Sequence, residues 1–64
     1  MEMNFDQANQ QVRALRAEGF DAVAAECLPW NGNRYCVVFK TRRELEQFRN
    51  FNKDWDIKIT ELVG

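Results

Sequence analysis

The sequence has 64 residues, of which 45% are apolar and 30% charged, and its formal net charge is −1. This balance is typical of a folded globular domain, and the near-neutral charge disfavours a dedicated nucleic-acid binder. A domain of this size buries only about 60% of the surface that its unfolded chain exposes, so its core is thin. We therefore expect a single domain over residues 1–64.

The N-terminal segment, Met1-Glu2-Met3-Asn4, lacks the basic region and apolar run of a secretory signal. No apolar stretch approaches the roughly 20 residues that are needed to span a bilayer. We expect a cytoplasmic protein of a bacterial cell without a membrane partner. In that compartment cysteines are kept reduced.

The first helix is predicted over residues 5–18. Asn4 and Gln7 form the pattern of a capping box at its start, and Gly19 suits the left-handed residue that follows many helices. Its apolar positions recur at steps of three and four and form one stripe: Phe5, Ala8, Val12 and Leu15.

A second helix is predicted to begin after Thr41, because Thr41 and Glu44 again match a capping box. Asn52 is expected to end this helix in the left-handed conformation. Its apolar residues repeat every three positions and are expected to face a sheet: Leu45, Phe48 and Phe51.

Residues 21–28 and 34–40 are predicted to form two strands of a hairpin. Asn31-Gly32 between apolar runs favours a two-residue type I′ turn, which places Leu28 opposite Tyr35 and Cys27 opposite Cys36. In this register the two cysteines lie on one face, either as small buried hydrophobic residues or as a cross-strand disulfide. The reducing cytoplasm favours the free thiols.

A third strand is predicted over residues 55–63, where apolar and polar residues alternate. The expected fold class is α+β, with the order helix–strand–strand–helix–strand and both helices on one face of a three-stranded sheet. Two strand orders fit. The apolar run 36–39 suits a central strand and Pro29 an edge strand, which favours the order 1-2-3 over the all-antiparallel order 2-1-3.

The chain contains no histidine and no serine, so it lacks the nucleophile pairs and the commonest general base of enzymes. Cys27 and Cys36 are the only soft metal ligands, which is too few for a structural zinc centre. No glycine-rich phosphate loop is present. We expect a protein that is not an enzyme and has no catalytic residue, cofactor or metal.

Binding is the function that remains, and two surfaces are candidates. Trp, Tyr and Arg are enriched at interface hot spots, which favours the hairpin tip: Trp30, Asn31, Asn33, Arg34 and Tyr35. Acidic residues and a second tryptophan mark the last strand and its neighbours: Glu26, Asp54, Trp55, Asp56 and Glu61. The alternatives are that both tryptophans close the ends of the core, and that the acids belong to a mixed solvated surface.

The helix–strand–strand–helix–strand order resembles an RNA-recognition-motif domain that lacks its first strand. Val37 and Phe39 match the family's RNA-stacking pattern. This resemblance implies a small RNA- or DNA-binding module that uses Tyr35, Phe39 and the helix arginines.

In size, charge and lack of catalytic groups the chain also resembles small inhibitors encoded by phages and mobile elements, including anti-CRISPR proteins. This resemblance implies a protein that blocks a nucleic-acid or subunit site on a CRISPR–Cas or other defence complex. Its mimics of DNA phosphates would be Asp54, Asp56, Glu26 and Glu61. We take such a protein-binding inhibitor as the leading hypothesis, ahead of direct nucleic-acid binding. A further alternative is an assembly protein whose sheet edge pairs with itself or a partner, and we expect a monomer or weak homodimer.

Overall fold

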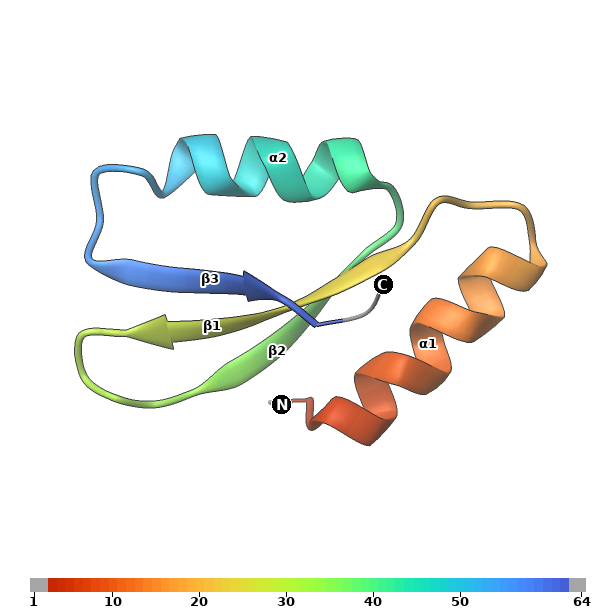
Figure 1. Cartoon of the computed structure of the whole chain (residues 1–64), viewed down its shortest axis with the longest axis horizontal. Coiled ribbons are helices and arrows are strands. Elements are labelled where there is room, and N and C mark those ends of the chain that lie inside the picture. The colour runs from red at the N-terminus through yellow and green to blue at the C-terminus, as the bar shows by residue number, and fades with distance from the viewer. Residues whose placement is uncertain (1–2, 63–64) are drawn as a thin grey trace.

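The computed structural model describes residues 3–62 as one α+β domain (Figure 1). Its elements follow the predicted order and are α1 (Phe5–Ala17), β1 (Val23–Pro29), β2 (Tyr35–Phe39), α2 (Arg42–Phe51) and β3 (Ile57–Glu61). The fold class is confirmed. The last strand begins at Ile57, two residues after its predicted start, and ends at Glu61, while residue 63 of the prediction lies outside the described residues.

The ends of α1 form as their sequence predicts. The Asn4 side chain accepts a hydrogen bond from the Gln7 amide at 2.8 Å, and the Gln7 side chain accepts one from the Asn4 amide at 3.2 Å. At the other end Gly19 has φ +97°, and the Phe20 amide donates to the Leu15 carbonyl at 3.1 Å. These bonds satisfy backbone groups that a helix end leaves unpaired.

Helix α2 begins with a variant of the predicted cap. The Thr41 hydroxyl accepts from the Glu44 amide at 3.3 Å, while the Glu44 carboxylate accepts from the Lys40 amide at 3.0 Å. At the other end Asn52 has φ −101°, so its predicted left-handed conformation is wrong. The Asn52 side-chain amide instead donates to the Phe48 carbonyl at 2.8 Å and closes the last turn.

The strand order is β2-β1-β3, and both pairings are antiparallel. The favoured order 1-2-3 is therefore wrong, and the alternative 2-1-3 is confirmed. Pro29 fits the central strand because it is the last residue of β1 and faces Ile57. The Leu62 amide donates to the Ala24 carbonyl, so these two residues form a hydrogen-bonded pair. Hydrogen-bonded and non-hydrogen-bonded pairs alternate along an antiparallel ladder, so Pro29 forms a non-hydrogen-bonded pair with β3. A backbone N–H at this position would point toward β2. On that side the chain has already turned away, so a proline is tolerated there.

The hairpin register differs by one residue from the prediction. Cys27 faces Tyr35 and Glu26 faces Cys36. The Gly32 amide donates to the Pro29 carbonyl at 2.9 Å, and Gly32 has φ +82°. No described residue other than glycine has positive φ, so Asn31 cannot take part in a type I′ turn. A shift of one residue moves every side chain of one strand to the other face relative to its neighbour.

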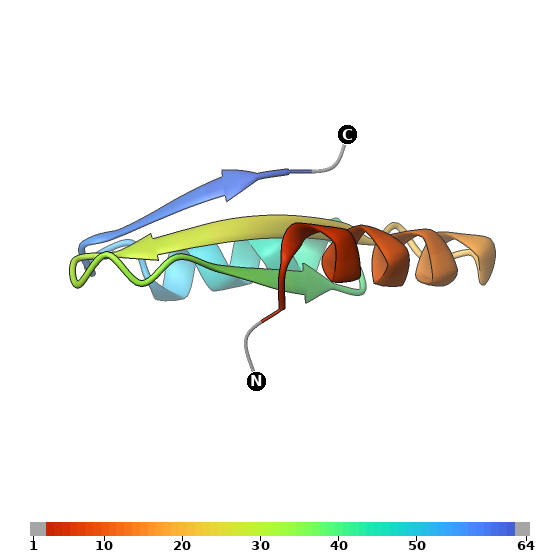
Figure 2. The ribbon, with the colours of Figure 1, turned by 90° about the horizontal axis from the view of Figure 1, so that it is seen from below.

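The two helices cover opposite faces of the sheet, so the prediction of one shared face is wrong. Figure 1 places α1 and α2 on opposite sides of the strands, and Figure 2 shows α1 in front of the sheet and α2 behind it. On the α1 face, buried residues of helix and sheet pack together: Ala8, Val12, Ala22 and Ala24. On the α2 face the buried set is Val23, Ala25, Phe39 and Leu45. Successive residues from Ala22 to Ala25 thus contribute alternately to two separate clusters.

Both clusters are small, and several large apolar residues lie outside them. Two of the four fully buried residues of β1 are alanines, and the largest fully buried side chain among the described residues is Leu45. Phe5 and Phe51, which were predicted to face the core, are exposed, and Phe20 is 36% exposed. Within the described residues, no helix is long and apolar enough to cross a membrane.

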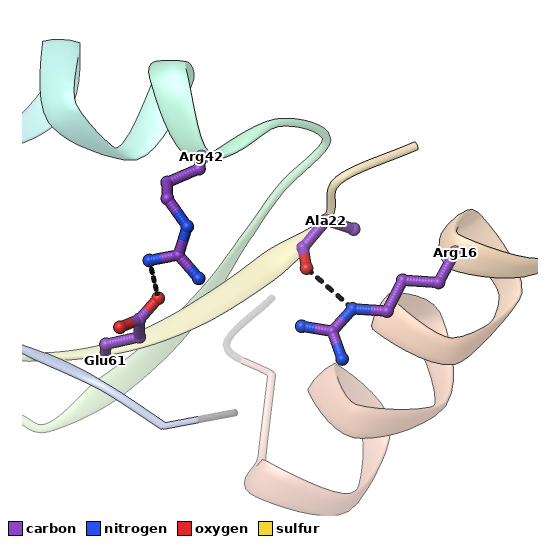
Figure 3. Close-up of polar contacts among 4 residues, drawn as sticks. All are labelled: Arg16, Ala22, Arg42 and Glu61. Carbon is purple, nitrogen blue, oxygen red and sulfur yellow. Dashed lines mark hydrogen bonds and ion pairs between the residues drawn. The ribbon is translucent and has the colours of Figure 1, made fainter. Parts of the chain in front are cut away.

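Two arginines connect the helices to the sheet (Figure 3). The Arg16 Nε donates to the Ala22 carbonyl at 3.0 Å, which links the end of α1 to the start of β1. Arg42, in the first turn of α2, forms an ion pair with Glu61 at the end of β3. The first contact spans the connection between α1 and β1, and the second joins the start of α2 to the end of β3.

Two residues of α2 test this division between core and surface. Leu45→Ala removes a side chain that is 1% exposed, and we expect it to lower the free energy of unfolding by about 2–5 kcal/mol. Phe51→Ala removes a larger side chain that is 81% exposed, and we expect a change within about 0.5 kcal/mol. Urea unfolding followed by circular dichroism measures both. Equal losses for the two variants would contradict the packing of α2.

Candidate functional site: an exposed aromatic end

Two loops and a helix terminus meet at one end of the molecule. In β1–β3 pairing Pro29 faces Ile57, so the hairpin tip that follows β1 lies beside the segment that leads into β3. Figures 1 and 2 both show the β1–β2 loop and the α2–β3 loop at the same end, where α2 also terminates. The two surfaces that the sequence marked separately are therefore adjacent.

Three large aromatic residues occupy this end, and we call them the aromatic end: Trp30, Phe51 and Trp55. Their exposed fractions are 82%, 81% and 66%. The alternative that the tryptophans close the core is thus wrong. Water-exposed apolar surface is costly, and in soluble proteins its concentration at one place marks an interaction site.

Hydrogen bonds within the two loops hold the aromatic end in place. In the hairpin tip, the Asn31 side chain accepts from the Asn33 amide at 3.0 Å, beside the turn bond from Gly32 to Pro29. In the second loop, the Trp55 amide donates to the Asn52 carbonyl at 3.0 Å. These bonds restrict the backbone of both loops, and a restricted loop loses less entropy on binding.

Polar residues of the predicted site surround the aromatic end. Asn31, Asn33, Asp54 and Asp56 are exposed and lie in the same two loops. An apolar centre with a polar, solvent-accessible rim is the usual composition of a protein–protein interface. The structure thus places three of the residues predicted at the hairpin tip, Trp30, Asn31 and Asn33, beside those predicted at the entry to the last strand.

The remaining predicted residues lie elsewhere. Arg34 leaves the tip and forms an ion pair with Glu26 at 3.3 Å. Tyr35 faces Cys27 on the α2 face, away from its predicted neighbour Leu28. Glu61 lies at the far end of β3 in its ion pair with Arg42.

The acidic residues do not form one patch. Glu61 faces Ala25, so it lies on the α2 face, while Glu26, the next residue of β1, lies on the opposite face. Both of these carboxylates are also neutralised by an arginine. Asp54 and Asp56 precede β3 and therefore lie at the opposite end of that strand from Glu61.

The aromatic residue of the RNA-stacking pattern is not accessible. Phe39 is buried and packs edge-on against Phe48 of α2, with their ring centroids 5.3 Å apart. Stacking on nucleic-acid bases needs an exposed ring face. Helix α2 thus covers the sheet position on which the RNA-recognition-motif resemblance depends.

The two cysteines are free thiols on opposite faces of the sheet. Burial raises the pKa of both, and for Cys27 a hydrogen bond with the Tyr35 side chain acts in the opposite direction. A raised pKa lowers the fraction of thiolate, which is the form of cysteine that acts as a nucleophile or metal ligand. Within residues 3–62, no group of three or more acidic, cysteine or histidine residues could hold a metal ion.

Phe51 belongs to the aromatic end but was missed by the sequence analysis. An α-helix turns by 3.6 residues, so each step of three falls about 60° short of a full turn. Phe51 is two such steps from Leu45 and therefore points about 120° away from it. This angle, together with the position of Phe51 at the end of the helix, is the sequence signal that could have indicated its exposure.

No protein-family model, curated protein or solved structure matches this chain.

The Cys27 thiol predicts a pH dependence of stability. Because its pKa is raised in the folded protein, the unfolded state ionises first as the pH passes the ordinary value of about 9. The unfolded state then binds fewer protons than the folded state, so the free energy of unfolding falls with rising pH. Urea unfolding at a series of pH values measures this slope. Cys27→Ala is expected to flatten it, and an unchanged slope would contradict the burial of the thiol.

Proposed function

We propose that this chain is a non-enzymatic, protein-binding inhibitor that uses its aromatic end to occupy a site on another protein. The observation that carries the proposal is the exposure of Trp30, Phe51 and Trp55 at one end of a domain whose own core is small. Tryptophan is among the residues that contribute most to binding energy when a partner buries it. A rigid apolar end of this kind fits an apolar pocket.

Inhibition by occupancy agrees with the chemistry of the described residues. The aromatic end contains no nucleophile, and the carboxylates of Asp54 and Asp56 beside it are exposed. Its effect on a partner would therefore arise from exclusion of another ligand or subunit. The defined loop conformations support this mechanism, because a preorganised surface can bind a groove without first becoming ordered.

The class of partner that we propose is a bacterial nucleic-acid-handling complex, with CRISPR–Cas and other defence complexes as the first candidates. The support for this class is the resemblance in size, charge and lack of catalytic groups to small phage-encoded inhibitors. Carboxylate mimicry of DNA has less support, since Glu26 and Glu61 lie on opposite faces and are paired. We therefore favour steric blocking through apolar contacts.

Affinity capture with a double variant tests the proposal. The tagged chain is used to recover proteins from a bacterial lysate, and the recovered complex is purified and assayed for binding of its own nucleic acid. We expect the wild-type chain to reduce that binding and Trp30→Ala/Trp55→Ala to lose the effect. Each buried tryptophan at a hot spot contributes about 2 kcal/mol or more, so the pair is expected to weaken binding at least several hundred-fold.

Phe5→Ala is the matched control, because it removes an exposed aromatic residue from the start of α1, away from the aromatic end. Thermal unfolding of all variants verifies that the fold is retained. Equal inhibition by the double variant and the wild type would contradict the proposal. So would recovery of nucleic acid alone, with salt-dependent binding to a random oligonucleotide.

A further inference from the structure

The two outer edges of the sheet differ in their protection. Along β2, residue Met3 forms an antiparallel bridge with Cys36, so the N-terminal segment occupies part of that edge. Along β3 no described residue pairs with the outer edge. The helices pack mainly on β1 and β2, and Ile57 and Ile59 of β3 are only half-buried. An edge strand that lacks such cover presents free backbone groups to another strand.

The backbone groups at this edge can be assigned from the β1–β3 ladder. The hydrogen bond from the Leu62 amide to the Ala24 carbonyl makes their pair a hydrogen-bonded one. By alternation, the N–H and C=O of Ile59 and Glu61 point away from β1 and toward the outside. The Ile57 amide points the same way but already donates to the Trp55 carbonyl at 2.8 Å. Its carbonyl is on the outer edge as well.

We propose that a second copy of this chain pairs antiparallel with the outer edge of β3, with Ile59 opposite Ile59 of the partner subunit. In this register the two Ile59 residues exchange both backbone hydrogen bonds. At each end the Ile57 carbonyl accepts from the partner's Glu61. The pairing is isologous, as in most homodimers, and joins two three-stranded sheets into one continuous sheet.

Lys58 disfavours the neighbouring register toward the start of β3. A two-fold axis normal to the sheet places the α2 faces of both copies on the same side of the joined sheet. The register can therefore shift only in steps that keep each side chain on its own face. Moving it one step toward the start of β3 would place Lys58 opposite the partner's Lys58, and like charges directly opposite are destabilising. In the proposed register Lys58 faces the partner's Thr60. The apolar Ile59 side chains then meet on the α2 face.

The small core gives a physical reason for such a dimer. Domains below about 70–80 residues rarely gain enough stability from a single core and commonly add disulfides, metals or oligomerisation. Both cysteines are free, and residues 3–62 hold no cluster suited to a metal. Pairing through β3 would bury further surface of the half-buried isoleucines. The two aromatic ends would then lie at opposite ends of the joined strands, which gives the dimer two binding ends.

Sedimentation equilibrium over a concentration series tests the dimer. We expect the mass of the wild-type chain to rise from that of the 7.6 kDa monomer toward twice that value. A single monomeric species at all concentrations up to about 1 mM, the weak end of specific association, would overturn the proposal.

Thr60→Lys tests the interface and its register. The introduced lysine faces the partner's Lys58 twice in the dimer, and we expect dimerisation to weaken on the order of tenfold. Within one chain it faces Glu26, so the fold of the monomer is not weakened. Gln47→Lys, on the exposed side of α2, is the control with the same change of charge.

A charge reversal completes the test. Adding Lys58→Glu to Thr60→Lys places opposite charges across the interface, and we expect the dimer to form at least as tightly as in the wild type. A dimer that Thr60→Lys leaves unchanged would overturn the β3 edge as the interface. Failure of the second substitution to restore the dimer would overturn the register. Thermal unfolding at low concentration separates both results from a loss of the fold.

Discussion

The structure depends on strand β1, which is hydrogen-bonded on both sides and buried on both faces. Its residues Val23, Ala24, Ala25 and Cys27 are all fully buried. Because successive side chains of a strand point to opposite faces, Ala24 contributes to the cluster under α1, and Val23 and Ala25 to the cluster under α2. The register of β1 with its two neighbours thus determines which residues form each half of the core.

Small side chains in β1 have a consequence for the rest of the molecule. Alanines on a sheet fill little volume, so neither cluster can enclose many large residues. The aromatic residues are divided accordingly. Phe39 and Phe48 pack together under α2, whereas Trp30, Phe51 and Trp55 remain exposed at one end. The small size of the core and the exposure of the aromatic residues at the candidate binding surface therefore have one cause, the small side chains of β1.

Local signals in the sequence predicted the parts of the fold that depend on neighbouring residues. Asn4 with Gln7, Thr41 with Glu44, and Gly19 each form a cap whose geometry involves only a few adjacent residues. The hairpin was less well defined locally, because Asn-Gly is compatible both with a type I′ turn and with a turn that is left-handed at the glycine alone. Only the pairing along the whole of β1 distinguishes these registers.

The strand order and the assembly of the candidate site are non-local. Pro29 indicated an edge strand, but a proline at the last position of a central strand needs no partner on the side where the neighbouring strand has ended. Trp30 and Trp55 were both recognised from their residue type. Their placement at one end follows from the pairing of β1 with β3, across the intervening β2 and α2. Sequence patterns of period two or 3.6 contain no information on that pairing.

Cross-strand nuclear Overhauser effects test the central role of the β1 register most directly. In an antiparallel sheet the Hα atoms of non-hydrogen-bonded pairs are close, since their Cα atoms lie about 4.5 Å apart. The structure predicts strong Hα–Hα contacts between Ala24 and Val38 and between Glu26 and Cys36. A strong contact between Cys27 and Cys36 would contradict it, because that register would exchange the faces of β2 and join the two clusters differently.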